Sequence, residues 1–409
     1  MISHIPDALQ RMKIPDLTEF IGMSLREAER GLEAIKSHEL ELDATYANTH
    51  RFPSPTWAVP TFIESANGKG MTYTPYRGDK LVRQAVAKNI QSSFGITTQG
   101  ETDVILTPGT QAALFEAISA LVSPGDTVMV PDPDYLTTER ILKYLGANVI
   151  RIPMVWEHEN NIQGYGQLDF NVLNKALKSR PKLFIFSHPN NPTGTIYSEE
   201  TLSRLATLAI ENDFLIISDE LYCRLVFDER KFSHIANFPG MKQRTITLLG
   251  PSKTESLSGY RLGVAVAPSE IIELMEDLQS VTALRAPAYS QLLLAKWLVE
   301  DTEFLKDRIS DYQIQRDYTV QRLNESGYFE VAPNYGSAYL FPKVLIDIPD
   351  YTLVTALKEI AGVVVNPGYQ FGIRGLRHVR ICFAQDEKLW DRALDRIFKV
   401  MATLSAKSI

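Results

Sequence analysis

Six short apolar runs, separated by segments of helical character, constrain the fold of this chain more than any other feature. Each run has four to six residues and is bounded by turn-forming residues such as Pro, Gly or Asp. A buried helix is longer than this, so each run predicts a buried strand. Strands that are apolar throughout and alternate with helices are typical of a mostly parallel sheet covered by helices on both faces. The runs are residues 104–107, 127–130, 183–187, 214–218, 245–250 and 262–267.

Three segments beside these runs have the spacing or the capping of helices. Residues 80–94 carry apolar side chains on one side at helical spacing, and residues 110–121 follow the first run directly. Residues 198–211 begin at Ser198, a good N-cap residue, and the two glutamates after it complement the helix dipole. The predicted fold class is therefore α/β, with a large domain built on a mostly parallel sheet.

The pattern changes after about residue 270 and predicts a second, smaller α+β domain. A helical tract covers residues 269–326, with an interruption expected near Pro287. Short apolar segments and a closing helix from about Asp386 follow. A helix-prone stretch also lies near the N-terminus, at residues 25–41. The expected division is an arm and lead-in that belongs to the small domain, a large domain and a small C-terminal domain, at residues 1–55, 56–280 and 281–409.

Composition excludes several classes of protein. The 409 residues are 44% hydrophobic and 22% charged, which is typical of a globular chain with a sizeable core. The formal net charge of -7 provides no basic excess for a nucleic-acid partner. No apolar run approaches the roughly 20 residues that span a bilayer. Two cysteines without metal-ligand spacing predict neither a disulfide framework nor a metal site, so we expect a cytoplasmic protein.

A lysine and an arginine follow the fifth apolar run. Lys253 lies among small and hydroxyl residues just beyond a buried strand, a poor place for a purely solvated charge. Such an amine suits a Schiff base with an aldehyde cofactor, because partial desolvation favours its neutral, nucleophilic form. Arg261, eight positions later, suits a phosphate on the same cofactor. Alone, the two residues favour a loop lysine and a surface arginine over a cofactor site.

Other polar residues follow the ends of the neighbouring strands, where open α/β sheets bind their ligands. After the first run, Gly109, Thr110 and Gln111 open a helix, and its exposed N–H groups form an anion site. Tyr135 follows the second run, where an aromatic ring can stack on a planar ligand or pack on its neighbours. Asn191 follows the third run and can donate to a phenolate-type oxygen.

The fourth apolar run ends on a carboxylate. Asp219 follows a strand that is otherwise wholly apolar, and a buried carboxylate without a partner is costly. A cationic partner is therefore expected, and the protonated nitrogen of a pyridine ring suits this role. Tyr222, three residues later, is positioned to share a phenolate oxygen with Asn191.

Together these motifs, in this order, resemble those of the class I/II aminotransferases, which are fold-type I pyridoxal-phosphate enzymes. The resemblance covers roughly residues 73–384. The segments that carry it are YTPYRG (73–78), PGTQA (108–112), Tyr135, PNNPTG (189–194), DELY (219–222), SK (252–253), GYR (259–261) and PGYQFGIRGLRHVR (367–380).

The resemblance implies a role for each matching residue. Lys253 forms the Schiff base with pyridoxal 5′-phosphate, Asp219 keeps the pyridine nitrogen protonated, and Tyr222 acts with Asn191 on the 3′-oxygen. Tyr135 stacks on the ring, and Arg380 binds the substrate α-carboxylate. The residues implied around the phosphate are Gly109, Thr110, Gln111, Ser252 and Arg261, with Tyr73 reaching the phosphate of a neighbouring subunit, which implies a homodimer with shared active sites.

The sequence departs from the family pattern in two places. Gly250 occupies a position that is commonly a phosphate-binding serine, so Ser252 must supply that contact or the contact is missing. The loop that normally covers the substrate, here residues 44–55, also lacks its usual form. Arg285 and Arg51 are candidates for reading a distal substrate carboxylate, and an interface or surface role is the alternative for each.

The resemblance implies ping-pong transfer of an amino group between an L-amino acid and a 2-oxo acid. The alternative is a carbon–sulfur β-lyase or another reaction at Cα with the same cofactor. A regulator with an added DNA-binding module is disfavoured by the negative charge. A nicotinamide dehydrogenase is disfavoured because no G-x-G-x-x-G motif follows an early strand.

Overall fold

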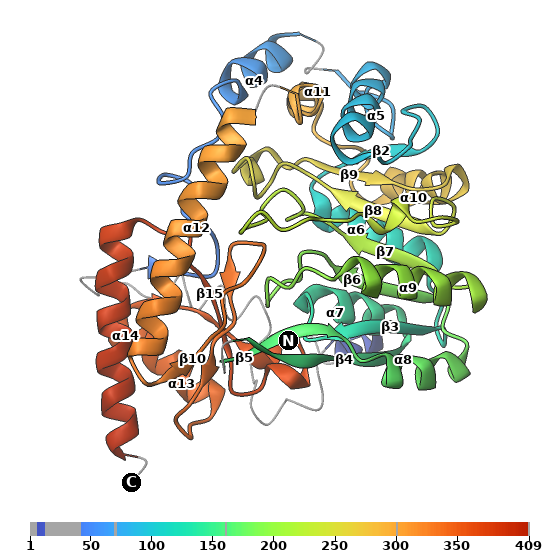
Figure 1. The fold of residues 1–409 in the computed structure, drawn as a ribbon. Helices are drawn as coiled ribbons and strands as arrows, with labels where there is room; N and C mark the ends of the chain where they lie inside the picture. Colours follow the sequence, from blue (N-terminus) through green and yellow to red (C-terminus); the bar gives the residue numbers. More distant parts are fainter. Residues whose placement is uncertain (1–5, 13–41, 69–71, 160–161, 300–301, 408–409) are drawn as a thin grey trace.

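An eight-stranded sheet forms the centre of the computed structural model (Figure 1). Its strand order is β2-β9-β8-β7-β6-β3-β4-β5. All six predicted strands form, each with ends within two residues of the prediction. They are β2 (Val104–Thr107), β3 (Thr127–Asp132), β6 (Leu183–Ser187), β7 (Leu215–Asp219), β8 (Thr245–Leu249) and β9 (Gly263–Val266). The structure describes residues 6–12, 42–68, 72–159, 162–299 and 302–407.

The sheet is mostly parallel, as predicted. Strands β4, β3, β6, β7 and β8 pair in parallel, whereas β9 is antiparallel to both of its neighbours. The antiparallel pair β4 (Asn148–Glu159) and β5 (Ile162–Leu168) at one edge was not predicted. These two segments interleave polar and apolar residues, as NVIRIPMVWEHE shows, and lack the continuous apolar character of the central strands. Only β5 is an edge strand; β4 pairs with β3 through residues 148–153 and with β5 through residues 154–159, so each half of β4 has a strand neighbour on one side only and does not need that character.

Helices cover both faces of the sheet and bury alternate side chains of each strand. Ile185 in β6 packs toward one helix layer, and its neighbour Phe184 packs toward the other. The first layer consists of α6 (Thr110–Leu121), α7 (Leu136–Leu145) and α10 (Ser269–Thr282). The second layer consists of α5 (Lys80–Phe94), α8 (Phe170–Ala176), α9 (Glu199–Glu211) and α11 (Leu292–Lys296).

Side-chain caps fix where two of these helices begin. Asp79 accepts hydrogen bonds from the N–H groups of Leu81 and Val82 at the start of α5. Ser198 accepts one from Thr201 N–H at 3.1 Å, which confirms it as the N-cap of α9. Each cap satisfies an N–H group that has no partner within its helix.

The second half of the chain forms long helices around three small sheets. The helical tract predicted over residues 269–326 is three helices, because the chain leaves helical geometry around Pro287 and again after α11, where Trp297 is extended. In Figure 1, α12 and α14 lie side by side at the left. The elements are α12 (Thr302–Glu325), α13 (Asp350–Ala356), α14 (Glu387–Lys407), β10 (Phe329–Glu330), β11 (Tyr339–Leu340), β12 (Lys343–Val344), β14 (Asn366–Pro367) and β15 (Val379–Cys382).

An N-terminal strand joins this part of the molecule. β1 (Leu42–Asp43) pairs in parallel with β13 (Val363–Val364), and Phe52 packs into the same apolar cluster as α12 and α14. The short helices α1 (Asp7–Arg11) and α4 (Ala58–Asn67) flank β1 in the sequence. The helix predicted at residues 25–41 lies outside the described residues. The domain boundaries at residues 55 and 280 stay predictions. Within the described part of the chain, no helix is long and apolar enough to cross a membrane.

Candidate active site

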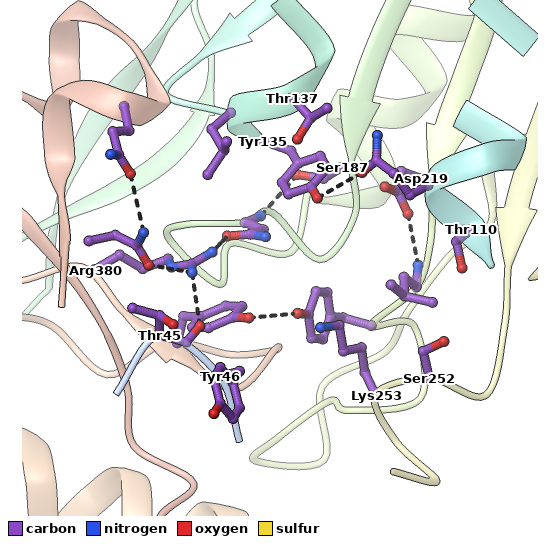
Figure 2. A pocket seen from close by; sticks show the side chains of 18 of the residues that line it. Thr45, Tyr46, Thr110, Tyr135, Thr137, Ser187, Asp219, Ser252, Lys253 and Arg380 are labelled. Atoms are coloured by element: carbon purple, nitrogen blue, oxygen red, sulfur yellow. Dashed lines mark hydrogen bonds between the residues drawn. The ribbon is translucent and has the colours of Figure 1, made fainter. Parts of the chain in front are cut away.

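A cavity of about 340 Å³ lies at the carboxyl ends of the parallel strands (Figure 2). Strands β3, β6, β7 and β8 are parallel neighbours, so the residues that follow them meet at one edge of the sheet. Because β9 runs the opposite way, the residues that precede it reach the same edge. The predicted residues brought together around the cavity are Thr110, Gln111, Tyr135, Asn191, Asp219, Tyr222, Ser252, Lys253, Arg261 and Arg380.

The start of α6 forms one corner of the cavity. Gly109 is the N-cap, with a φ of 89° that side chains rarely adopt, and the hydroxyl of Thr110 is buried without a partner. A Cβ on Gly263 would lie 2.5 Å from the main chain of Gly109 and Thr110, so only glycine allows this close approach. The Arg261 guanidinium lies against the same turn and donates to Pro108 O at 3.4 Å. A helix N-terminus, an arginine and an unpartnered hydroxyl make an anion site.

The position of Gly250 accounts for its departure from the family pattern. A Cβ there would lie 3.1 Å from the Thr110 hydroxyl and 3.2 Å from Leu262 O, closer than an ordinary contact. The glycine therefore leaves room for Thr110. Ser252 lines the cavity nearby.

Lys253 and Asp219 face the cavity from adjacent strand ends. Burial raises the pKa of the Asp219 carboxyl to about 6, and the hydrogen bond from Leu221 N–H and the charge of Lys253 only partly oppose this rise. A cationic ligand in the cavity would supply the charge that this carboxylate lacks. Figure 2 shows Asp219 and Lys253 on the same side of the cavity, and the dashed line at Asp219 is the hydrogen bond from Leu221 N–H.

Two tyrosines are fixed by their hydroxyl groups. Tyr135 donates to Gln111 Oε1 at 2.9 Å, which ties the ring to the first turn of α6. Tyr222 donates to the hydroxyl of Tyr339 at 3.1 Å, and burial raises the pKa of Tyr222 well above its usual value. Tyr222 therefore donates a proton rather than carrying a charge. In this structure its partner is Tyr339, not the Asn191 amide.

Arg380 closes the opposite side of the cavity from β15. Its guanidinium donates to Asn191 Oδ1 at 2.9 Å, Thr45 O at 3.0 Å and Asn366 Oδ1 at 2.6 Å. It also lies 3.9 Å from the centre of the Tyr339 ring. The Nε atom is buried without a partner. The side chain is thus held in place with donor capacity left, as a carboxylate site requires.

Four predicted residues do not line this cavity: Gly109, which directly precedes the lining residue Thr110, and Arg51, Arg285 and Tyr73. Arg51 forms ion pairs with Asp311 and Glu387, at 3.4 and 2.8 Å. The Arg285 guanidinium lies 4.3 Å from the centre of the Tyr73 ring, and both residues line a separate hollow. Tyr73 is 84% exposed.

Several lining residues were not predicted. Thr45 contributes a main-chain carbonyl, and no sequence motif reports the direction of a carbonyl group. Asn366 directly precedes the PGYQFG motif, and its position beside that motif was the available signal. Gln370, within the same motif, accepts from the Asn366 amide at 3.2 Å.

A family model described as aminotransferase class I and II matches residues 43–397. The chain belongs to this aminotransferase family. An aromatic-amino-acid aminotransferase 2 of Thermococcus litoralis is 30% identical over 347 residues, 84% of this chain and 87% of that protein. An aspartate aminotransferase of Pyrococcus abyssi is 30% identical over 349 residues, with the same two coverages. The crystal structure of an aspartate aminotransferase from Rhodobacter sphaeroides superposes with a TM-score of 0.85 at 32% identity, covering 91% of this chain and 96% of that one.

The match confirms the resemblance, the fold class and the aminotransferase activity. An aminotransferase moves an amino group between an amino acid and a 2-oxo acid, and this family uses pyridoxal 5′-phosphate. The relatives named here are aminotransferases and give the β-lyase alternative no support. The residues around the cavity fit the cofactor: an anion corner at Thr110, an amine at Lys253, and a carboxylate at Asp219 that lacks a cation.

Proposed function

We propose that this aminotransferase binds pyridoxal 5′-phosphate through Lys253 and works by a ping-pong mechanism. The observation that carries the proposal is the shared cavity, which Lys253, Asp219 and Arg380 line together. When bound, the cofactor supplies an aldehyde that reacts with amines and a ring that accepts electron density. Gly109, Thr110 and the Arg261 guanidinium would hold its phosphate.

The protein's own groups perform the other tasks. The Asp219 carboxylate would hold a proton at the ring nitrogen by charge, and the Tyr222 hydroxyl would donate to the ring oxygen. Arg380 binds the α-carboxylate of the amino acid and so fixes the direction of its Cα–H bond. The Lys253 amine would take the proton from the substrate Cα and would deliver it to the aldehyde carbon that the cofactor supplies. Tyr135 would pack against the ring and limit its movement.

Replacing the lysine tests this assignment. Lys253→Ala should lose transamination by a factor of about 10⁴ or more, because one group both attaches the cofactor and moves the proton. Borohydride treatment of the wild-type protein should add the mass of the reduced cofactor at Lys253, and the variant should gain none. Lys242→Ala, which removes a partly exposed lysine in an ion pair with Asp103, is the control. Wild-type turnover in Lys253→Ala would refute the proposal.

We propose a homodimer with shared active sites as the working unit. Tyr73 is exposed and lies away from the cavity of its own chain, which suits a residue that acts in the neighbouring subunit. Val281 is 80% exposed, so a large apolar side chain is also left uncovered near Arg285. Mixing two defective variants tests the sharing. A hybrid dimer, with one Lys253→Ala subunit and one Tyr73→Ala subunit, should be more active than a dimer of either variant alone. One of its two sites then has both residues intact. No recovery from a hybrid that forms would refute it.

We infer that the donor belongs to the dicarboxylic or aromatic L-amino acids. The inference rests on the relatives named as aspartate and aromatic-amino-acid aminotransferases. Arg285 is the proposed reader of a distal carboxylate, delivered from the partner subunit, and Arg51 is the second candidate. A panel of donors and 2-oxo acids, measured on the purified protein, tests the class. Activity confined to small neutral donors would contradict it.

A further inference from the structure

Asp134 is a buried carboxylate for which the proposed mechanism has no role. It lies in the turn after β3, immediately before Tyr135, and is 6% exposed. It does not line the cavity itself, although both Tyr135 and Ser187 beside it do. A buried acid is costly unless its oxygens accept hydrogen bonds, so its surroundings should show what it does.

Three hydrogen-bond donors converge on the Asp134 carboxylate. Tyr135 N–H donates to Oδ1 at 2.5 Å, and Ser187 N–H donates to Oδ2 at 3.1 Å. The Ser187 hydroxyl donates to Oδ1 at 2.5 Å. Two of these donors belong to Ser187, the last residue of β6, so the carboxylate joins the ends of two neighbouring strands.

Ser187 carries the connection into the cavity. Its hydroxyl oxygen accepts from Asn191 N–H at 2.9 Å, which fixes the PNNPTG loop from behind. The Asn191 side chain then accepts from Arg380 Nη1 at 2.9 Å. A continuous chain of hydrogen bonds thus leads from Asp134 through Ser187 and Asn191 to the carboxylate-binding arginine.

The main chain of Asp134 makes a second connection to the same region. Its N–H donates to Phe371 O at 2.9 Å, and the Phe371 ring lies 4.9 Å from the Arg380 guanidinium. Asp134 is therefore linked to both segments that support Arg380. The link to the Asn191 loop runs through Ser187, and the link to the PGYQFG segment is direct.

This arrangement fits the ionised form of Asp134. Burial raises its pKa to about 7, the bonds from Ser187 and Tyr135 N–H act in the opposite direction, and the nearby charge of Asp219 raises it further. A neutral carboxyl carries a proton on one of its oxygens, and each oxygen already accepts a hydrogen bond, Oδ1 from Tyr135 N–H and the Ser187 hydroxyl and Oδ2 from Ser187 N–H, so protonation would disrupt at least one of these bonds. The ionised form keeps every hydrogen bond in place.

We propose that Asp134 is a positioning residue of the active site, which acts through the Ser187 hydroxyl to hold Asn191 and thereby the Arg380 guanidinium. This inference rests on the proposed function, because Asn191 and Arg380 are its proposed cofactor and substrate residues. The tests are Asp134→Asn, Ser187→Ala and the double variant. Asp350→Asn is the matched control, because Asp350 is a buried carboxyl that accepts from Arg377 N–H at 3.0 Å and does not line the cavity.

Three quantities are measured for each protein: the dissociation constant of pyridoxal 5′-phosphate on the cofactor-free form, KM and kcat for the donor, and the melting temperature. Loss of a charge-assisted bond in Asp134→Asn should weaken cofactor binding about tenfold and raise KM more than it lowers kcat. Ser187→Ala should do the same. The dissociation constant and KM of the double variant should lie within about twofold of those of the more impaired single variant, because the two residues act in series.

The Asp350→Asn control distinguishes a positioning role of Asp134 from a role in protein stability alone. Asp350→Asn should lower the melting temperature and leave the dissociation constant and KM unchanged. If Asp134→Asn and Ser187→Ala behave like this control, Asp134 is only structural and the proposal is overturned. Additive effects in the double variant would overturn it as well. Ser187→Ala removes a single hydroxyl and keeps the test decisive if Asp134→Asn fails to fold. If the wild-type protein binds no pyridoxal 5′-phosphate, the result instead refutes the proposed function itself.

Discussion

Replacing Asp219 by asparagine should stabilise the cofactor-free protein while weakening its hold on the cofactor. Burial raises the pKa of this carboxyl from 3.8 to about 6. A shift of about two units corresponds to ~3 kcal/mol of unfavourable free energy once the group is ionised. This is an upper limit, because the cavity side of the carboxylate meets solvent. Asparagine keeps an oxygen for Leu221 N–H, so the variant removes the charge and retains the hydrogen bond.

The effect should depend on pH in a defined direction. The folded state binds the Asp219 proton more tightly than the unfolded state, so the cost is absent below about pH 4. It grows as the pH rises through the folded pKa of about 6 and is complete above it. The stabilisation by Asp219→Asn should therefore be small at acidic pH, about half developed at pH ~5 and full at pH ~8.

Thermal unfolding of the cofactor-free proteins measures this difference. For 409 residues, ~3 kcal/mol corresponds to a rise in melting temperature of about 3 °C. Under the proposed function the cofactor should reverse the order of stability, because its protonated ring nitrogen would pair with the Asp219 carboxylate and not with asparagine. Its dissociation constant should rise at least about tenfold in the variant. A cofactor-free variant less stable than the wild type at pH ~8, or a difference independent of pH, would refute the reasoning.

Two further changes test the anion corner and the substrate arginines. Gly263→Ala should weaken cofactor binding at least about tenfold, since its Cβ would meet the Gly109–Thr110 main chain at 2.5 Å, whereas Gly259→Ala has no neighbour within 4 Å and serves as the control. Equal affinities in equilibrium dialysis would contradict this. Arg285→Ala should lower kcat/KM for aspartate about 100-fold more than for neutral donors. Arg51→Ala, whose arginine is held in two surface ion pairs, should cost no more than about 1 kcal/mol of stability and leave donor selectivity unchanged. Selectivity lost in Arg51→Ala instead would reverse the assignment.

The central sheet and most of the cavity could be predicted because each depends on local sequence. Continuous apolar runs identify buried strands, and the polar residues that follow them must meet at one sheet edge. Lys253 and Asp219 were found in this way. The resemblance added Arg380, which lies in another part of the chain.

The remaining features depend on contacts that no local pattern encodes. The β4–β5 pair lies at an edge where alternating polar residues are tolerated, so its strands lack the apolar signature. The carbonyl of Thr45 and the hydrogen bond between Tyr222 and Tyr339 depend on how distant segments dock. Asp134 lies in a turn, and a sequence does not report that a turn aspartate is enclosed.

The hydrogen bond between Arg380 and Thr45 also sets the order of events during synthesis. The carbonyl is made 335 residues before the guanidinium that binds it. At about 5–20 residues per second, the ribosome needs roughly 20 seconds to a minute to supply the missing partner. Until then Arg380 is absent. The carboxyl ends of the parallel strands in the nascent chain are therefore open on the side that Arg380 closes in the finished protein. The proposed site for the substrate carboxylate is therefore completed late in synthesis, and chains that stop before residue 380 should lack it.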